Sequence, residues 1–278
     1  MLVIISAVFK LTRPLNCLIG GLSILIAAIV AGIDSSWDKV GFAVLSGIFI
    51  TAGANSINDW FDLDIDRINR PDRVLPQGLI STKTALGAAI ILFACGIIIS
   101  IFINFYAIII TVLSSIVLLL YSAFLKRQVL WGNITVSFMT ALAFIYGALA
   151  AGNIGGGVVP ALLAFQFHLG REIIKDMEDM EGDKKQGAKT LPIVHGEIVT
   201  KVVVTIVFAL LIGFSFVPYV LQIYNLLYLI TVVIGVDFVL LSVSFLLWKN
   251  STERRLNLYS TILKIDMLIG LLAIYVGK

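Results

Sequence analysis

The sequence predicts an all-α, polytopic membrane protein with nine transmembrane helices around a central cavity. The chain is 59% hydrophobic and 13% charged, and its mean hydropathy is +1.04, whereas an ordinary soluble domain has about 25% charged residues. The stretches between Lys83 and Lys126 and between Arg127 and Arg171 hold 42 and 43 residues without a charged side chain. Each is long enough for two crossings of a bilayer, since one helix needs about 20 residues. This pattern excludes a soluble enzyme, a nucleic-acid-binding protein and a disulfide scaffold.

The elements follow from the apolar runs and from the residues that interrupt them. Met1–Phe9 is apolar but short, and basic residues follow rather than precede it, so we expect an interfacial helix and no signal peptide. Gly, Pro and Asn residues typical of turns separate the longer runs. The nine expected spans are Leu15–Ile33, Val40–Ile57, Thr84–Phe102, Tyr106–Phe124, Leu130–Ala151, Val158–Ile174, Val202–Val217, Leu226–Trp248 and Leu256–Val276. We expect residues 1–278 to form a single transmembrane domain.

The distribution of charge indicates the orientation of these spans. With nine spans, 17 of the 20 basic residues fall on the side of the N-terminus, which the positive-inside rule identifies as cytoplasmic. Twelve of the 17 acidic residues lie in two loops on the same side, within Asp59–Asp72 and Glu172–Glu197. Anchoring at a membrane surface favours cations rather than carboxylates. The two acidic loops therefore indicate a functional site on the cytoplasmic face.

The two acidic loops contain the same motif. Each has aspartates at positions i, i+3 and i+7, followed by basic residues and then by Leu-Pro, which makes a weak internal repeat. Spacings of three and four place side chains on one face of a helix. The aspartates are Asp59, Asp62 and Asp66 in the first loop, and Asp176, Asp179 and Asp183 in the second.

A bound divalent cation explains why the carboxylates gather in this way. Like charges on one helical face repel each other, and anions near a helix C-terminus are disfavoured by the helix dipole. The motifs offer oxygen ligands, which favour a hard ion such as Mg²⁺, typically held by one or two carboxylates together with substrate phosphates. For either loop taken alone, the alternative is a solvated acidic segment with intrahelical ion pairs.

The motif Asn58-Asp59-x-x-Asp62-x-x-x-Asp66 resembles the first signature of the UbiA superfamily of intramembrane prenyltransferases. The aspartates of the second loop resemble the second signature of that superfamily. A Tyr-Lys element after the fourth span has its counterpart in Tyr121 and Lys126, with one more residue between them than is common. The resemblance extends to nine spans and to the position of both motifs, so it covers nearly the whole chain.

The resemblance implies an isoprenyl diphosphate bound through Mg²⁺ by both motifs, and it implies roles for individual residues. The implied metal ligands are Asn58, Asp59, Asp62, Asp66, Asp176, Asp179 and Asp183. The implied catalytic residues are Asp62, Asp183, Tyr121 and Lys126. The residues implied to contact the substrate are Arg13, Asn16, Arg67, Lys126, Arg127, Arg171 and Lys175.

Within the superfamily, Arg13-Pro14-Leu15-Asn16 and the Glu-Gly-Asp183 ending most resemble the branch that makes archaeal ether lipids. This resemblance implies geranylgeranyl diphosphate as the donor and geranylgeranylglyceryl phosphate as the acceptor, in a cell membrane with the active site facing the cytoplasm. It implies membrane lipid as a partner and no nucleic acid, and it leaves the oligomeric state open.

Three alternatives remain to be weighed. An aromatic prenyltransferase of quinone biosynthesis would use a hydroxybenzoate or dihydroxynaphthoate acceptor at the same motifs. A transporter would place ionisable residues near the bilayer midplane, where this chain has Asp237, Lys264 and Asp266. A CDP-alcohol phosphotransferase has its acidic residues in one contiguous signature, whereas the two motifs here lie more than 100 residues apart.

Overall fold

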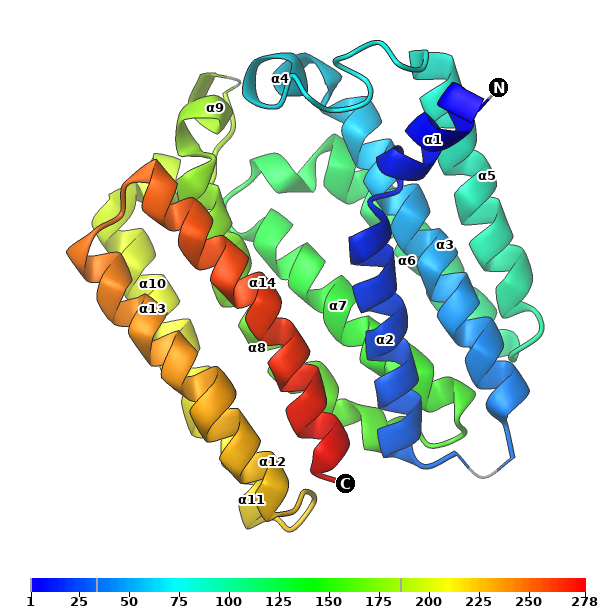
Figure 1. Ribbon diagram of the computed structural model, residues 1–278, viewed down its shortest axis with the longest axis vertical. Helices are drawn as coiled ribbons and strands as arrows, with labels where there is room; N and C mark the ends of the chain where they lie inside the picture. The colour runs from blue at the N-terminus through cyan, green and yellow to red at the C-terminus, as the bar shows by residue number, and fades with distance from the viewer. Residues whose placement is uncertain (1, 34, 186) are drawn as a thin grey trace. The chain divides into compact units, whose positions relative to one another are not determined.

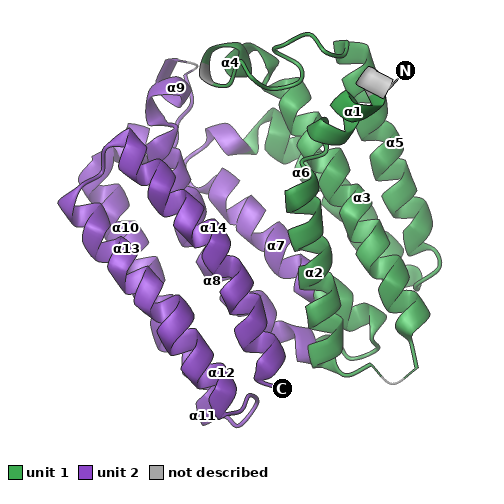
Figure 2. Cartoon of the chain, viewed as in Figure 1, with its two compact units in different colours: residues 1–125, 145–155 green, residues 126–144, 156–278 purple. Residues whose placement is uncertain are grey.

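The computed structural model describes residues 2–33, 35–185 and 187–278, and the regular elements of these residues are helices (Figure 1). The chain divides into two compact units (Figure 2). Unit 1 comprises residues 1–125 and 145–155, and unit 2 comprises residues 126–144 and 156–278. One acidic motif lies in each unit. That the whole chain acts as a single domain stays a prediction.

Unit 1 contains the first acidic motif on α3 and α4. Its helices are α1 (Leu2–Leu11), α2 (Pro14–Ala31), α3 (Trp37–Phe61), α4 (Leu63–Asn69), α5 (Thr82–Ser100) and α6 (Phe105–Ala123). Side-chain caps define where two of them begin: Ser81 Oγ accepts from the Thr84 N–H, and Asn104 Oδ1 from the Ala107 N–H. Capping satisfies amides that have no partner within the helix. A helix, α1, lies where the interfacial helix is expected, apart from Met1, which lies outside the described residues. Its position at the membrane interface stays a prediction.

Unit 2 contains the second acidic motif on α8 and α9. Three elements are shared with unit 1 at the boundary: η1 (Leu125–Arg127), α7 (Trp131–Ala150) and η2 (Ile154–Gly157). The others lie wholly in unit 2 and are α8 (Val158–Glu178), α9 (Met180–Lys185), α10 (Leu191–Ser215), α11 (Val217–Val220), α12 (Leu226–Thr231), the π-helical segment η3 (Val232–Asp237), α13 (Phe238–Lys249) and α14 (Glu253–Val276). Gly196, with φ of 82°, interrupts the start of α10. Asn225 caps α12 by accepting from the Leu227 N–H.

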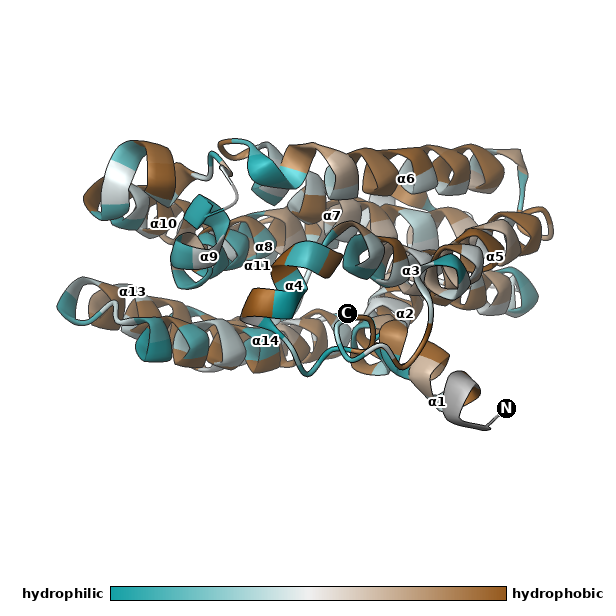
Figure 3. Cartoon of the chain, turned by 90° about the horizontal axis from the view of Figure 1, so that it is seen from above, coloured by the Kyte–Doolittle hydropathy of each residue, from teal (hydrophilic) through white to brown (hydrophobic). Residues whose placement is uncertain are grey.

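Eight helical segments among the described residues are long and apolar enough to cross a membrane, and they match eight of the nine expected spans. In Figure 3 apolar residues dominate α5 and α6, whereas hydrophilic residues gather at α9 and on part of α4. The remaining expected span is α8, which has 21 residues but carries Arg171, Glu172 and Lys175 toward its C-terminal end. The chain is therefore a multi-pass helical membrane protein, and crossing by α8 stays a prediction.

Small residues let the helices of each unit pack closely, as is common in membranes. In unit 1, a Cβ atom at Gly96 on α5 would lie 3.1 Å from the Ser46 carbonyl oxygen of α3. Ser46 Oγ donates to the Gly96 carbonyl at 2.8 Å and accepts from the Tyr146 hydroxyl at 3.0 Å. In unit 2, a Cβ atom at Gly170 on α8 would lie 2.1 Å from Cε1 of Phe208 on α10. These contacts fix the helices that carry the acidic motifs.

Candidate functional site

The first motif lies where α3 gives way to α4. Asp62 is both the last cap of α3 and the first cap of α4, with φ of −90° and ψ of 4°. Its N–H still donates to the Asn58 carbonyl at 2.9 Å, and the Asp66 N–H donates to the Asp62 carbonyl at 2.8 Å. The motif is thus a bent helix rather than the continuous one that the spacing predicts. The bend keeps the side chains of Asp59 and Asp66 buried while Asp64 stays 92% exposed.

Two arginines hold the buried carboxylates of the first motif. Arg73 Nη1 lies 2.5 Å from Asp66 Oδ2 and 3.4 Å from Asp59 Oδ1. Arg13 forms a second ion pair with Asp59. Arg13 has φ of 52°, a left-handed conformation that costs about 1–3 kcal/mol in a residue with a Cβ atom. This strained position is where the chain turns from α1 into α2 and brings the guanidinium to α3.

The pKa values in this cluster show two opposing effects. Burial raises the pKa of Asp66, and the Arg73 guanidinium opposes that shift through its charge and its hydrogen bond. Burial lowers the pKa of Arg73, but Asp59 and Asp66 raise it by more, so the net shift is upward. The charged form of Asp66 therefore depends on a neighbouring cation. Asp62 is held differently, because Asn58 Nδ2 donates to Asp62 Oδ2 at 3.0 Å.

The second motif has the same backbone form as the first. Asp179 ends α8 with φ of −88° and ψ of 2°, within 2° of the angles of Asp62. Its N–H donates to the Lys175 carbonyl at 2.9 Å, and the Asp183 N–H donates to the Asp179 carbonyl at 3.0 Å. The short helix α9 then begins at Met180, with acidic residues in its first turn and basic residues in its last. The repeat predicted from the sequence is therefore present as a repeated structural bend.

A buried amide supports the second motif. Asn133 on α7 is 4% exposed, and its Nδ2 donates to Asp176 Oδ2 at 2.9 Å. Downstream of the motif, the Lys189 N–H donates to the Arg127 carbonyl at 2.8 Å and ties this segment to η1. Lys126 also lies in η1 and is half-buried. Lys126 and Arg127 thus lie on a segment that is bonded to the chain that follows the second motif.

The remaining predicted site residues, Tyr121 as a catalytic residue and the others as substrate contacts, fall into two groups. Arg67 pairs with Asp64 at 3.1 Å on the exposed side of α4, and Arg171 Nη1 lies 2.6 Å from Glu172 Oε1 on α8. Asn16 on α2, Tyr121 near the end of α6 and Lys175 on α8 are half-buried. Contact with a substrate stays a prediction for all of these residues.

Sequence reasoning did not assign two residues that the structure joins to the motifs, Arg73 and Asn133. Arg73 lies seven residues after Asp66, beyond Pro71, in a loop without periodic structure. Its only sequence signal is the basic run that follows the aspartates. Asn133 lies 43 residues before Asp176, and its signal is an amide in the first turn of an otherwise apolar helix. Neither signal identifies the carboxylate that the side chain contacts.

The donor set of both motifs fits a hard cation in its chemistry. The ligand atoms on offer are carboxylate and amide oxygens, which Mg²⁺ prefers. Within residues 2–33, 35–185 and 187–278, no group of three or more His, Cys, Asp and Glu side chains is placed to hold a metal by itself. Mg²⁺ commonly binds one or two carboxylates and completes its shell with substrate phosphates and water. Either motif has enough carboxylates for that mode of binding.

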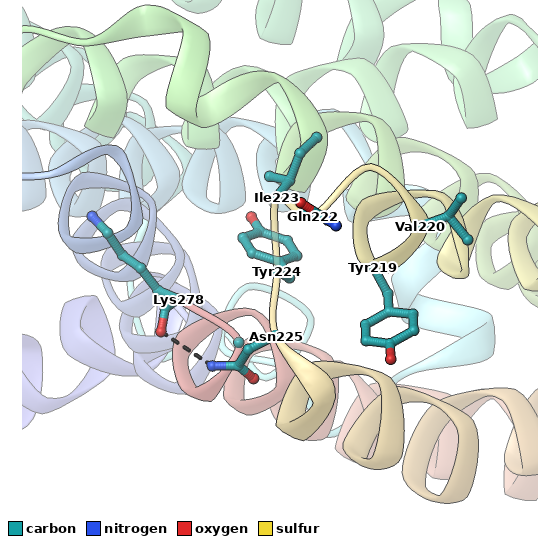
Figure 4. Close-up of a pocket in the computed structure, with 8 residues that line it drawn as sticks. Tyr219, Val220, Gln222, Ile223, Tyr224, Asn225 and Lys278 are labelled. Carbon is teal, nitrogen blue, oxygen red and sulfur yellow. Dashed lines mark hydrogen bonds between the residues drawn. The ribbon is translucent and has the colours of Figure 1, made fainter.

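A hollow in unit 2 lies away from this chemistry. It has a volume of about 560 Å³ and is lined by residues of the α11–α12 turn and of the C-terminus, among them Tyr219, Tyr224, Asn225 and Lys278 (Figure 4). Asn225 Nδ2 donates to the Lys278 carbonyl at 3.2 Å across this hollow. In Figure 1 it lies at the end of unit 2 opposite α9. It contains no residue of the acidic motif, so we do not assign it to the candidate site.

The arginine pairing in unit 1 gives a first testable prediction. We expect Arg73→Met to lower the stability of unit 1 by about 2 kcal/mol, because it leaves Asp66 buried without its charged donor. Arg67→Met is the matched control, since the Arg67 and Asp64 side chains are 61% and 92% exposed and such pairs contribute little. Thermal unfolding of the purified protein in detergent measures both changes. Equal stability of the two variants would contradict a structural role for Arg73.

The helices and the two bends define a class of protein: a multi-pass membrane protein with a pair of aspartate-rich motifs suited to binding a metal-complexed phosphate. Comparison with known proteins assigns the family. The UbiA prenyltransferase family model matches residues 18–268, and the chain belongs to this family. It is an intramembrane prenyltransferase.

The chain is similar to other members of this family over nearly its whole length. It is 36% identical to the digeranylgeranylglyceryl phosphate synthase of Thermococcus kodakarensis over 98% of both chains. A solved structure concerned with digeranylgeranylglyceryl phosphate synthase in membranes is 36% identical, covers 98% of both chains and has a TM-score of 0.80. A UbiA homologue from Archaeoglobus fulgidus, solved with DMAPP and Mg²⁺, shares the fold with 20% identity and a TM-score of 0.67, over 97% of this chain and 99% of its own.

Proposed function

We propose that the protein transfers a geranylgeranyl group from geranylgeranyl diphosphate to geranylgeranylglyceryl phosphate in a Mg²⁺-dependent reaction. The observation that supports this most strongly is the repeated bend, which presents Asp59, Asp62 and Asp66 in one unit and Asp176, Asp179 and Asp183 in the other. The likeness to the Thermococcus kodakarensis synthase along nearly the whole chain supports the choice of substrates.

The two motifs would bind the donor. In the first motif, Asn58, Asp62 and Asp66 would hold one Mg²⁺, with Asp59 in support. In the second motif, Asp179 and Asp183 would hold another, with Asp176 in support. Bound Mg²⁺ would neutralise the charge that develops on the leaving diphosphate. The allylic C–O bond to diphosphate breaks, and the acceptor hydroxyl oxygen forms the new bond to the same carbon. The hydroxyl proton passes to a phosphate oxygen or to a nearby carboxylate.

The acceptor brings a second phosphate, and the chain has cations for it. The basic residues of unit 2 that we assign to phosphate oxygens are Lys126, Arg127, Arg171 and Lys175. In unit 1 we assign Arg67, and Arg13 and Arg73 would be able to exchange their carboxylate partners for phosphate. An aromatic acceptor has one carboxylate or none and would not require this number of cations. The aromatic alternative is therefore less well supported by the charges of this chain.

Product identification tests the proposal directly. Purified protein in lipid vesicles is given labelled geranylgeranyl diphosphate, Mg²⁺ and geranylgeranylglyceryl phosphate. We expect a lipid with two geranylgeranyl ethers and a stoichiometric release of diphosphate, both measured by mass spectrometry. Hydrolysis of the donor without formation of the diether would contradict the proposal.

Orientation in the membrane is a further expectation. We propose that the protein lies in the cell membrane with both motifs facing the cytoplasm. If α8 crosses the membrane, 17 of the 20 basic residues lie on the same side of the membrane as the two motifs, and such residues favour the cytoplasmic side. A reporter fused after Lys278 should then lie outside, and one fused before Met1 should lie in the cytoplasm. A cytoplasmic signal from both reporters would mean an even number of crossings and would show that α8 does not span.

A further inference from the structure

Two aspartates in the middle of apolar spans have no role in the proposed transfer. Asp237 lies halfway along the span Leu226–Lys249, and Asp266 lies near the centre of Glu253–Val276. Both belong to unit 2, and they are 3% and 2% exposed. An ionisable residue at this depth is costly and indicates a functional site.

The contacts of this carboxylate pair leave most of its oxygen atoms unsatisfied. Ser215 Oγ on α10 donates to Asp237 Oδ2 at 2.9 Å. Asp237 Oδ1 and both carboxylate oxygens of Asp266 are buried and have no hydrogen-bond partner among the described residues. A Cβ atom at Gly270 on α14 would lie 3.9 Å from Cγ2 of Val236, the residue before Asp237, and Asp266 lies about one helical turn before Gly270. The two carboxyl groups therefore lie near each other. They are close without being hydrogen-bonded to each other.

The other polar groups nearby do not neutralise the pair. The Tyr228 hydroxyl on α12 donates to the Ser215 carbonyl at 2.9 Å and is thereby committed to the backbone. Lys264 is half-buried on α14, but two residues of helix place it about 200° around the axis from Asp266.

The backbone around the pair is unusual. Asp237 ends the π-helical segment η3, and such segments occur often at functional sites. Gly235 in η3 allows α14 to approach closely, since a Cβ atom there would lie 2.4 Å from Ile269 Cγ2. The irregular helix and the glycine together bring two carboxyl groups into one apolar environment. Na⁺ sites of membrane transporters also lie near the midplane at irregular helices.

Two buried carboxyl groups require a positive species. A shared proton would need a hydrogen bond between the carboxyl groups, and a separate proton on Asp266 would leave its O–H without an acceptor, because the three unsatisfied oxygens have no partner among the described residues. A hard cation between them would satisfy all three without that contact. Mg²⁺ releases its water reluctantly and usually keeps several molecules, which the apolar surroundings do not accommodate. A monovalent ion fits this position better.

We propose that Asp237 and Asp266 bind one Na⁺ ion inside unit 2, with Asp237 oriented by Ser215. This site is separate from the acidic motifs, and the inference does not depend on the proposed substrates. The ion would stabilise the packing of α14 against η3 by reducing the repulsion between the two carboxylates.

Thermal unfolding of the full-length protein in detergent tests the Na⁺ site. Choline chloride replaces NaCl at constant ionic strength and constant Mg²⁺. We expect the midpoint to rise with the logarithm of the Na⁺ concentration, by about 5 °C at one hundred times the dissociation constant. Asp266→Asn should abolish the response and should match or exceed the wild-type midpoint in choline, because it removes a buried carboxyl group that has lost its cation. Glu253→Gln, at an exposed position on the same helix, should keep the full response.

A second measurement uses the unmodified protein. A hydrophobic carbodiimide reacts with buried protonated carboxyl groups, and mass spectrometry locates the labelled residue. We expect labelling of Asp237 or Asp266 in choline and at least tenfold less labelling in Na⁺. The unfolding midpoint and the labelling yield of the wild type could instead respond to pH and not to Na⁺. That result would show that protons neutralise the pair, and it would overturn the proposal. A Na⁺ response retained by Asp266→Asn would overturn it as well.

Discussion

Replacement of Asp62 by Asn should lower prenyl transfer at least 100-fold while the protein still inserts and folds. Asp62 occupies the bend between α3 and α4. Asparagine preserves the shape and the backbone cap but removes the negative charge that we propose binds a metal. Loss of one group that stabilises the transition-state charge typically costs 100- to 1,000-fold in rate. Steady-state kinetics with labelled donor measure the loss.

The first motif has an internal control at Asp64. This residue lies two positions from Asp62, and its side chain is 92% exposed and pairs with Arg67. Asp64→Asn should change the rate by less than threefold. In the second motif, Asp183→Asn should be as damaging as Asp62→Asn, with the exposed Glu181→Gln as its control on α9. Equal losses at Asp64 and Asp62 would contradict the arrangement of functional carboxylates on one face.

Removal of divalent metal should abolish both transfer and donor binding. Two anionic motifs repel a trianionic diphosphate unless cations lie between the charges, so chelation with EDTA should weaken binding of geranylgeranyl diphosphate by more than 100-fold. Mg²⁺ should restore binding and turnover. Ca²⁺ should restore binding better than turnover, because its longer and more flexible coordination fits the octahedral arrangement of Mg²⁺ poorly.

Equilibrium binding of labelled donor in vesicles, followed by turnover in the same sample, separates these two effects. The Asp64→Asn variant should show the same metal dependence as the wild type. Tight binding of the donor in EDTA would show that Arg and Lys side chains hold the diphosphate without metal.

The helices were predictable because apolar length and capping residues are local properties of the sequence. The expected start at Leu226 agrees with α12, where Asn225 caps the helix, and the expected end at Val276 agrees with α14. The first helix after the N-terminal segment begins one residue earlier than expected, at Pro14. Burial in lipid requires every backbone amide to be hydrogen-bonded within its own helix. An apolar run long enough to cross the bilayer therefore has few alternatives to a helical conformation.

The bends at Asp62 and Asp179 were not predictable from spacing alone. Aspartates at i, i+3 and i+7 fit a straight helix as well as a bent one, and the N–H bonds to Asn58 and Lys175 continue through each bend. What the spacing did predict is which carboxylates share a face, since Asp59 and Asp66 are buried and Asp64 is not. The repeat in the sequence is thus a repeat in structure, although the spacing of the aspartates does not determine its bent shape.

Pairings between side chains that are far apart in the sequence could not be predicted, and the reason is physical. The Arg73 contact with Asp59 and the Asn133 contact with Asp176 depend on how loops and helices pack, and neither follows a helical period. Arg13 likewise reaches Asp59 across 46 residues through a left-handed turn that no glycine marks. Such contacts are fixed by tertiary packing rather than by local preference.

Acceptor competition is the measurement that tests the central claim most directly. Purified protein receives labelled geranylgeranyl diphosphate and Mg²⁺ with equal concentrations of geranylgeranylglyceryl phosphate, 4-hydroxybenzoate and dihydroxynaphthoate in one reaction, and the products are separated and counted. We predict that more than 95% of the transferred label appears in the glycerol phosphate diether. Label found mainly on either aromatic acceptor would contradict the ether-lipid function and would leave the chain as a prenyltransferase of another pathway.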